Sequence, residues 1–130
     1  MKKILNNWLP VIIWMGFIFI LSSISGLKSS FPDTWDIILR KLAHVTEFGI
    51  LSFLFFRAVY LQFSKHNWKI FIVVGIISLL YAVSDEWHQG FVDDRVGALN
   101  DVLIDLVGIV IGLDIGRRVL IKLTQTKNPS

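Results

Sequence analysis

The 130-residue sequence contains no cysteine. Disulfide bonds, thiolate metal sites and thiol nucleophiles are therefore excluded. Charged residues are also scarce, at 18% of the chain, whereas soluble domains keep about a quarter of their residues charged. The sequence has no serine nucleophile elbow, no phosphate-binding loop and no deaminase metal spacing, so no motif of these kinds fixes a reaction class.

Hydrophobic residues dominate instead, at 54% of the sequence. This composition predicts an integral membrane protein with a single domain over residues 1–130. Continuous apolar runs cover about residues 8–24, 42–61, 70–84 and 102–120. Each approaches the ~20 residues that a helix needs to cross a hydrocarbon layer, and residues 85–89 can extend the third run as helix. Because the runs do not alternate, a β-barrel is excluded, and the predicted fold is an all-α bundle of four transmembrane helices.

The first run has an alternative interpretation as a cleaved signal peptide, because two lysines precede it and small residues follow it. Its ~17 residues include Trp14, Phe17 and Phe19, which is long and bulky for a signal-peptide core of ~7–15 residues. This favours a membrane span. Cleavage would leave the orientation of the other three spans unchanged.

Basic residues predict the orientation of the spans. Most of the 13 lysine and arginine residues fall on the side of the two termini, and the other side keeps only Lys28, Arg40, Lys41 and Arg95. The positive-inside rule then predicts that both termini are cytoplasmic and that the protein is a multi-pass protein of the cell membrane. The net charge of +3 reflects this inner flank, where basic residues meet anionic lipid, and nucleic-acid binding is not expected.

Acidic and histidine side chains mark the opposite, outer ends of the spans. Lys41, His44 and Glu47 lie along one face of the second span, and Glu47 sits ~7.5 Å inside the apolar boundary at ~1.5 Å per residue. A carboxylate at that depth needs a partner. Lys41 or His44 can neutralise Glu47 to fix helix packing, or the group can serve as an acid/base or ligand pair.

The end of the third span is the densest polar cluster, with Asp85, Glu86, His88 and Gln89 within five positions. Carboxylates beside an imidazole suit proton transfer or a divalent metal ion, and the alternative is a helix end exposed to water. Arg95 follows in the next loop. It can clamp a phosphate or carboxylate, or pair with a nearby aspartate.

In the fourth span, Asp101 and Asp105 share a face with a ladder of small residues, Gly108, Gly112 and Gly116. Such a ladder lets another helix approach closely. The approaching helix can belong to this chain or to a second copy, which would form a homo-oligomer. Midway down the same span, Asp114 is expected to be buried and to pair with Arg57, Arg117 or Arg118 in a structural role.

Three separated blocks resemble the VanZ-like family of small bacterial membrane proteins, over roughly residues 40–112. The blocks are Lys41-x-x-His44-x-x-Glu47-Phe48-Gly49-x-Leu51, Ser84-Asp85-Glu86-x-His88-Gln89-x-Phe91-Val92-x-x-Arg95 and Asp101-Val102-Leu103-x-Asp105-x-x-Gly108. Two positions depart from the family pattern. Asp93-Asp94 stands where many members have Pro-Gly, and Asp105 stands where some carry asparagine.

The resemblance implies an association with low-level resistance to teicoplanin, a glycopeptide that binds cell-wall precursors outside the cell. The resemblance also implies that the motif residues are the candidate site residues, namely His44, Glu47, Asp85, Glu86, His88, Gln89, Arg95, Asp101 and Asp105. The charge pattern independently places these residues at the outer leaflet.

Two classes of function fit these observations. In the first, an enzyme or binding protein handles the headgroup of an envelope lipid or glycolipid, with histidine as proton carrier, carboxylates as base or ion ligands, and Arg95 as anion clamp. A divalent metal ion is chemically admissible there, although the spacing matches no established metal motif. In the second, a non-catalytic membrane factor acts through a protein partner, and its polar cluster serves helix packing. Transport fits less well, because four short helices leave little room for alternating access.

Overall fold

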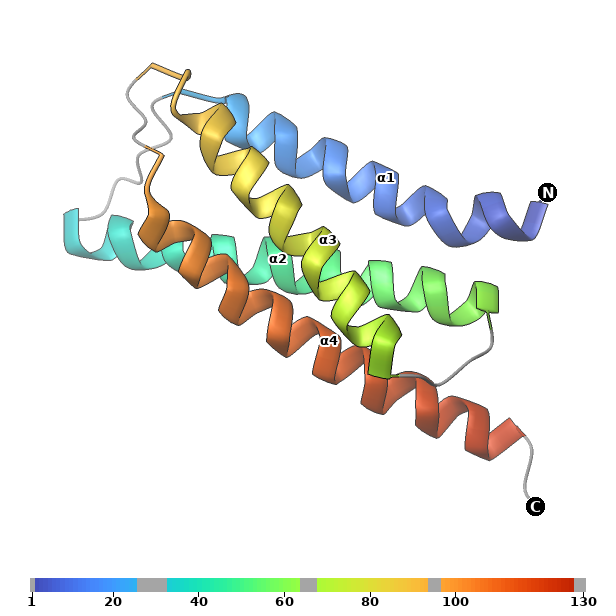
Figure 1. Ribbon diagram of the computed structural model, residues 1–130. Helices are drawn as coiled ribbons and strands as arrows, with labels where there is room; N and C mark the ends of the chain where they lie inside the picture. The colour runs from blue at the N-terminus through green and yellow to red at the C-terminus, as the bar shows by residue number, and fades with distance from the viewer. Residues whose placement is uncertain (1, 26–32, 64–67, 94–96, 128–130) are drawn as a thin grey trace.

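The computed structural model is a bundle of four α-helices, and it describes residues 2–25, 33–63, 68–93 and 97–127 (Figure 1). The helices are α1 (Lys2–Ser23), α2 (Asp33–Phe63), α3 (Trp68–Gln89) and α4 (Leu99–Lys127). All regular secondary structure in these described ranges is helical. The all-α prediction is therefore confirmed.

Helix α2 runs without a break from Asp33 through the second apolar run, and α3 continues through residues 85–89, as the sequence predicts for the third run. Helix α4 begins at Leu99, ahead of the fourth apolar run. The Asp101 amide donates to the Ala98 carbonyl at 2.8 Å, which places Asp101 inside the first turn.

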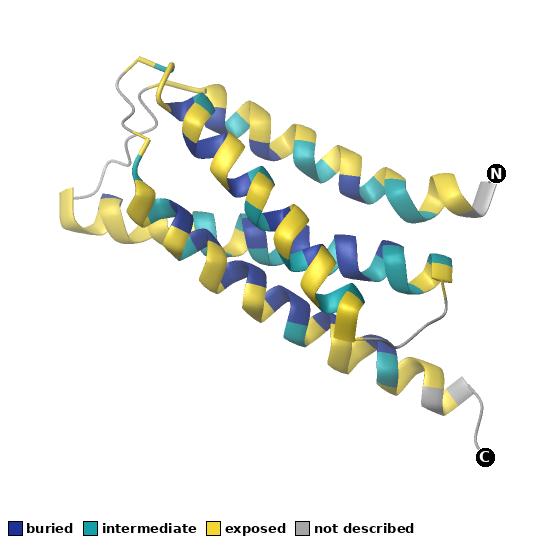
Figure 2. Ribbon diagram, viewed as in Figure 1, coloured by how far each residue is buried: buried dark blue, intermediate teal, exposed yellow. Residues whose placement is uncertain are grey.

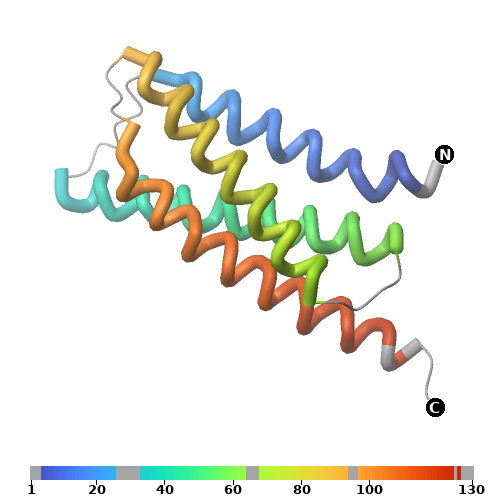
Figure 3. Tube along the Cα trace, viewed as in Figure 1, coloured from blue at the N-terminus to red at the C-terminus, as the bar shows by residue number. Residues whose placement is uncertain are grey.

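Successive helices run in opposite directions. The beginning of α1 and the end of α4 therefore lie at one end of the bundle (Figure 3). The opposite end, which we call the distal end, gathers the last turns of α1 and α3 and the first turns of α2 and α4 (Figure 1). Both termini thus share one side of the bundle, as the orientation argument requires.

Three of the described helices are long and apolar enough to cross a membrane: Ile4–Ser23 of α1, Asp33–Phe63 of α2 and Trp68–Gln89 of α3. Much of their apolar surface faces outward, as Figure 2 shows for α1. Leu5, Ile12 and Ile20 of α1 are each about 60% exposed. A soluble monomer rarely exposes apolar surface on this scale, so the bundle is built for lipid. α4 has 29 residues, and its role as a fourth span stays a prediction.

The closest helix contact joins α2 to α4, because glycines remove the side chains between the two backbones. A methyl group on Gly108 would collide with the Val45 carbonyl, and one on Gly112 would collide with the Gly49 carbonyl and the Ser52 hydroxyl. Ser52 Oγ donates to the Ile109 carbonyl across this contact at 3.0 Å. The glycine ladder thus packs against a helix of the same chain. Association of copies through it stays a prediction that one chain does not test.

α1 is attached to the bundle through side chains that donate to backbone carbonyls. The Trp14 indole N–H donates to the Glu47 carbonyl at 2.9 Å, and the Tyr81 hydroxyl donates to the Met15 carbonyl at 2.7 Å. Each bond satisfies a partly buried polar group, and an unpaired group away from water costs on the order of several kcal/mol. These bonds hold α1 against α2 and α3, and its last turn reaches the polar residues of the distal end.

Two ion pairs join residues at i, i+4 spacing, and the second shows which of its three expected partners Asp114 contacts. Arg40 Nη2 lies 2.8 Å from Asp36 Oδ2 at the distal end. Arg118 Nε lies 2.7 Å from Asp114 Oδ2 near the opposite end of α4. The Asp114 side chain is 44% exposed, so the expectation that it is buried is wrong. This pair lies far from the motif residues, which makes Asp114 a convenient control position.

Candidate functional site

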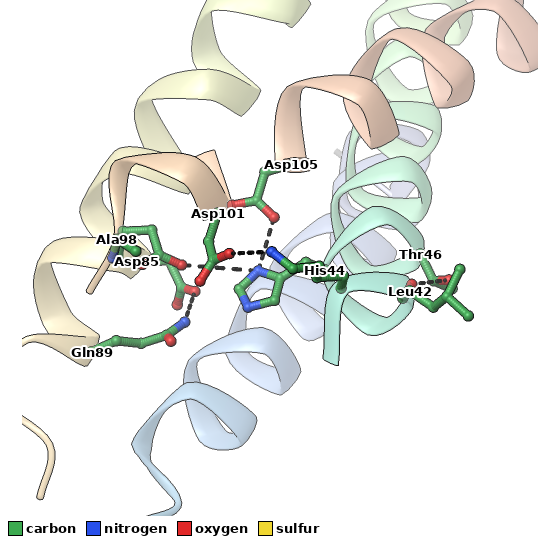
Figure 4. Close-up of polar contacts among 10 residues, drawn as sticks. Leu42, His44, Thr46, Asp85, Gln89, Ala98, Asp101 and Asp105 are labelled. Atoms are coloured by element: carbon green, nitrogen blue, oxygen red, sulfur yellow. Dashed lines mark hydrogen bonds and ion pairs between the residues drawn. The ribbon is translucent and has the colours of Figure 1, made fainter. Parts of the chain in front are cut away.

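A histidine and an aspartate form the centre of the polar residues at the distal end. His44 Nδ1 lies 2.9 Å from Asp105 Oδ1, and Asp105 has no exposed surface (Figure 4). Asp105 precedes Gly108 by one helical turn, so the close approach of α2 and α4 brings its carboxylate onto His44. An ionised carboxylate only accepts hydrogen bonds, so His44 Nδ1 donates. This bond fixes the ring, and the structure gives Nε2 no partner among the described residues.

Glu86 approaches the same histidine from α3. Its Oε1 lies 3.9 Å from His44 Nδ1, and its Oε2 accepts the Ala98 amide hydrogen at 3.0 Å. The Glu86 carboxylate therefore fastens the end of α3 to the start of α4. Gly97 makes this possible, because a methyl group there would collide with the Glu86 carbonyl.

Lys41 and Asp101 complete this group at its more exposed edge. Lys41 Nζ lies 3.5 Å from Asp101 Oδ1, and the two side chains are 46% and 28% exposed. An ion pair this open to solvent contributes little to stability. We call the group the central cluster, and it consists of Lys41, His44, Glu86, Asp101 and Asp105.

Two carboxylate oxygens of the central cluster are left without a hydrogen bond. Glu86 Oε1 and Asp105 Oδ2 are buried and have no hydrogen-bond partner among the described residues. Buried carboxylate oxygens are usually satisfied, because desolvation is costly when no donor replaces water. The cluster therefore has acceptor capacity that its own side chains do not use.

A pocket of about 210 Å³ lies beside the central cluster, between α1, α2 and α3. Asp85 and Gln89 form part of its wall, and Gln89 Nε2 donates to Asp85 Oδ2 at 2.8 Å (Figure 4). His44 belongs both to this wall and to the central cluster. We call this space the polar pocket, and it is lined by Leu21, Ser22, Arg40, Ala43, His44, Glu47, Asp85 and Gln89.

His88 lies apart from His44, although the sequence groups it with the same polar block. His88 Nε2 is 3.0 Å from Ser23 Oγ, and its ring stacks on Phe19 with centroids 4.7 Å apart. Both contacts are made with α1. A second, more aromatic pocket of about 350 Å³ lies on this side, lined in part by Trp87 and Phe91.

The sequence-predicted residues therefore divide into groups. His44, Glu86, Asp101 and Asp105 meet in the central cluster, Glu47, Asp85 and Gln89 line the polar pocket, and His88 faces α1. Arg95 lies outside the described residues.

The pocket also includes residues that the sequence did not single out as site residues. Arg40 precedes His44 by one turn, so helical periodicity alone can find it. Leu21 and Ser22 carry no such signal, because α1 is apolar around its whole circumference and offers no polar face.

A family model described as VanZ/LLP1 matches residues 7–122. The chain belongs to the VanZ-like family. The family assignment suggested by the three sequence blocks is thereby confirmed, and the match extends beyond them into α1 and most of α4. No curated protein and no solved structure matches the chain.

In this VanZ-like protein, the described residues of the three sequence blocks lie on α2, at the end of α3 with the turn that follows it, and on α4, and they meet at the distal end of the bundle. Chemically, the arrangement offers an imidazole that a buried carboxylate holds in one orientation, next to a pocket with both charged and apolar walls. An imidazole held in this way can accept or deliver a proton. The surplus carboxylate oxygens can take a cation.

Proposed function

We propose that this VanZ-like membrane protein spans the cell membrane four times, with both termini in the cytoplasm and the distal end at the outer surface. The length of α4 and its close contact with α2 support the fourth span. Asp105 and Asp114 of α4 have side-chain partners in His44 and Arg118, which lowers the cost of placing these carboxylates in the membrane.

Because the sequence has no cysteine, single cysteines can test this topology directly. Leu99, which is 78% exposed, begins α4, and the exposed Thr126 lies near its other end. In intact cells, a membrane-impermeant maleimide is expected to label a Leu99→Cys variant and not a Thr126→Cys variant. In permeabilised cells, both variants should be labelled. Labelling of both positions in intact cells, or of Thr126→Cys alone, would contradict the topology.

For the function, we propose that the polar pocket binds the headgroup of an envelope lipid or glycolipid. Its walls suit such a ligand, because carboxylate and amide groups of Glu47, Asp85 and Gln89 can bond to sugar hydroxyls and amides. Arg40 can pair with a phosphate, and Leu21 and Ala43 provide apolar contact. The pocket lies at the end of apolar helices, where a lipid anchored in the bilayer presents its headgroup.

The observation that carries this proposal is the position of His44, which lines the pocket while its Nδ1 donates to buried Asp105. The ring is oriented before any ligand arrives. Nε2 is then the atom that can accept a proton from a hydroxyl or amine of the headgroup, as a general base does. The same arrangement serves binding without catalysis, since Nε2 can also accept a hydrogen bond.

The biological test follows from the family resemblance to a teicoplanin-resistance factor. A glycopeptide-sensitive bacterium that expresses the protein is expected to survive more teicoplanin, and His44→Gln and Glu47→Gln variants are expected to lose the protection. Asp114→Asn, which changes an exposed carboxylate outside the site, should keep it. Minimal inhibitory concentrations are compared at equal amounts of inserted protein.

Full protection by His44→Gln and Glu47→Gln at wild-type membrane levels would contradict the pocket proposal. That result would support the second candidate, a non-catalytic factor that acts through a protein partner. The contacts that favour this second candidate are hydrogen bonds between helices of the same chain. Bonds such as Ser52 to Ile109 and His44 to Asp105 tie α2 to α4 and would fix a binding surface without chemistry.

A further inference from the structure

We propose that His44, Glu86 and Asp101 form a binding site for one divalent metal ion. Each residue comes from a different helix, α2, α3 and α4, and each offers a ligand atom. The three ligand atoms lie within 4.8 Å of one another. This inference concerns the central cluster and does not depend on lipid binding in the polar pocket. An ion on His44 Nε2 would exclude the general-base role of that nitrogen and would leave headgroup binding by the other pocket residues.

The unsatisfied oxygens are an independent reason to place a cation here. Glu86 is 6% exposed and Asp105 is fully buried, yet Glu86 Oε1 and Asp105 Oδ2 have no hydrogen-bond partner among the described residues. Glu86 Oε1 also lies 3.9 Å from His44 Nδ1. Because Nδ1 donates its hydrogen to Asp105, the imidazole would bind an ion through Nε2. A metal ion held by His44 and Glu86 would satisfy the Glu86 oxygen where no side-chain donor does.

Charge balance leads to the same conclusion. Three carboxylates, Glu86, Asp101 and Asp105, face one ammonium, Lys41, and one imidazole, His44. With all three carboxylates ionised, the cluster carries a surplus of negative charge even when the imidazole is protonated. Buried charge of one sign is costly in a medium of low dielectric constant, and a divalent cation would remove the surplus.

The ligand set favours Mn²⁺ or Zn²⁺ over Ca²⁺. One imidazole nitrogen with carboxylate oxygens suits transition ions, whereas Ca²⁺ prefers a shell made only of oxygen. Three ligands at ~2.1 Å from one ion lie roughly 3.4 to 3.6 Å apart in tetrahedral or trigonal geometry. Ligand atoms within 4.8 Å of one another would therefore each move toward the ion by up to about 0.7 Å, which carboxylate rotamers allow.

Asp105 acts as a positioning residue in this arrangement. Its Oδ1 accepts the His44 hydrogen bond and sets the orientation of the ring. A carboxylate behind a metal-binding histidine commonly plays this role, and its loss typically weakens metal binding 10- to 100-fold, on the order seen for outer-shell partners. Binding would join α2, α3 and α4 through one ion.

The test uses the full-length protein in detergent micelles without envelope lipid, stripped with a chelator and then titrated with Mn²⁺. Electron paramagnetic resonance measures the free ion. Wild-type protein is expected to bind one Mn²⁺ per chain, and Glu86→Gln and Asp101→Asn are expected to weaken binding at least about tenfold. Asp114→Asn is the matched control, since it removes a carboxylate from the same helix as Asp101 and should bind like wild type.

Equal Mn²⁺ affinity in Asp101→Asn and Asp114→Asn proteins would overturn the proposal, as would absence of binding by wild type. A measurement on wild type alone guards against misfolded variants. Bound Mn²⁺ should broaden the imidazole proton resonances of His44 far more than those of His88, which contacts α1 instead. Equal broadening, or none at His44, would also overturn the site. Mn²⁺ binding that persists while teicoplanin protection fails would count against the pocket function alone.

Discussion

Replacement of Gly112 by alanine is expected to destabilise the protein by about 3 kcal/mol, the upper part of the range for overpacked cores. The added methyl group would overlap the Gly49 carbonyl and the Ser52 hydroxyl, and backbone atoms cannot rotate away as a side chain can. α2 and α4 would have to separate. Separation would also stretch the bond from Ser52 to the Ile109 carbonyl and the bond from His44 to Asp105.

Thermal unfolding in detergent measures this effect. A loss of about 3 kcal/mol corresponds to a decrease in melting temperature of roughly 10 °C for a domain of this size. Gly16→Ala is the matched control, because a methyl group on Gly16 meets no atom within 4 Å. That variant should melt at or slightly above the wild-type temperature, since alanine favours helix. Equal melting temperatures for the two variants would show that α2 and α4 do not pack through these glycines.

The close contact between α2 and α4 also explains which part of the site the sequence could predict. Continuous apolar runs predict helices because lipid leaves the backbone no other way to satisfy its hydrogen bonds. Ionisable residues at one end of those runs predict a site because their burial is costly. Both arguments need only the sequence, and both led to residues such as His44 and Glu86 that meet at the distal end.

The sequence could not predict which individual side chains pair with one another. Helical periodicity places Lys41, His44 and Glu47 on one face, and it suggested Glu47 as the partner of the first two. In the structure, Asp105 bonds to His44 and Asp101 contacts Lys41. Which residues pair depends on the rotation of α4 about its axis relative to α2. The glycine contact fixes this rotation, and the sequence pattern of either helix alone does not.

The sequence also could not predict which residues of α1 belong to the site, and the reason is different. α1 is apolar on all sides, so no periodic pattern indicates which face turns toward the bundle. The contacts of Phe19 and Ser23 with His88, and the place of Ser22 in the polar pocket, follow only from three-dimensional packing. An uncharged residue that lines a pocket, such as Ser22, cannot be recognised from the sequence composition.

The largest functional effect is expected when the polar pocket is filled and its charges are left in place. Ala43 lines the pocket of about 210 Å³ and is exposed, so Ala43→Phe should occupy that space without disturbing the core. The phenylalanine side chain would then exclude the headgroup from the pocket. Binding is expected to weaken at least about tenfold, or 1.4 kcal/mol. Thr46→Phe is the control, because Thr46 is an exposed residue on the same helix that does not line the pocket.

The most direct test of the account measures how tightly a fluorescent peptidoglycan lipid precursor binds to the purified protein in lipid nanodiscs. Wild-type and Thr46→Phe proteins are predicted to bind the precursor with the same affinity, and Ala43→Phe is predicted to bind it at least about tenfold more weakly. If the wild-type protein does not bind the precursor, or if Ala43→Phe binds it as well as Thr46→Phe does, the polar pocket is not the headgroup site.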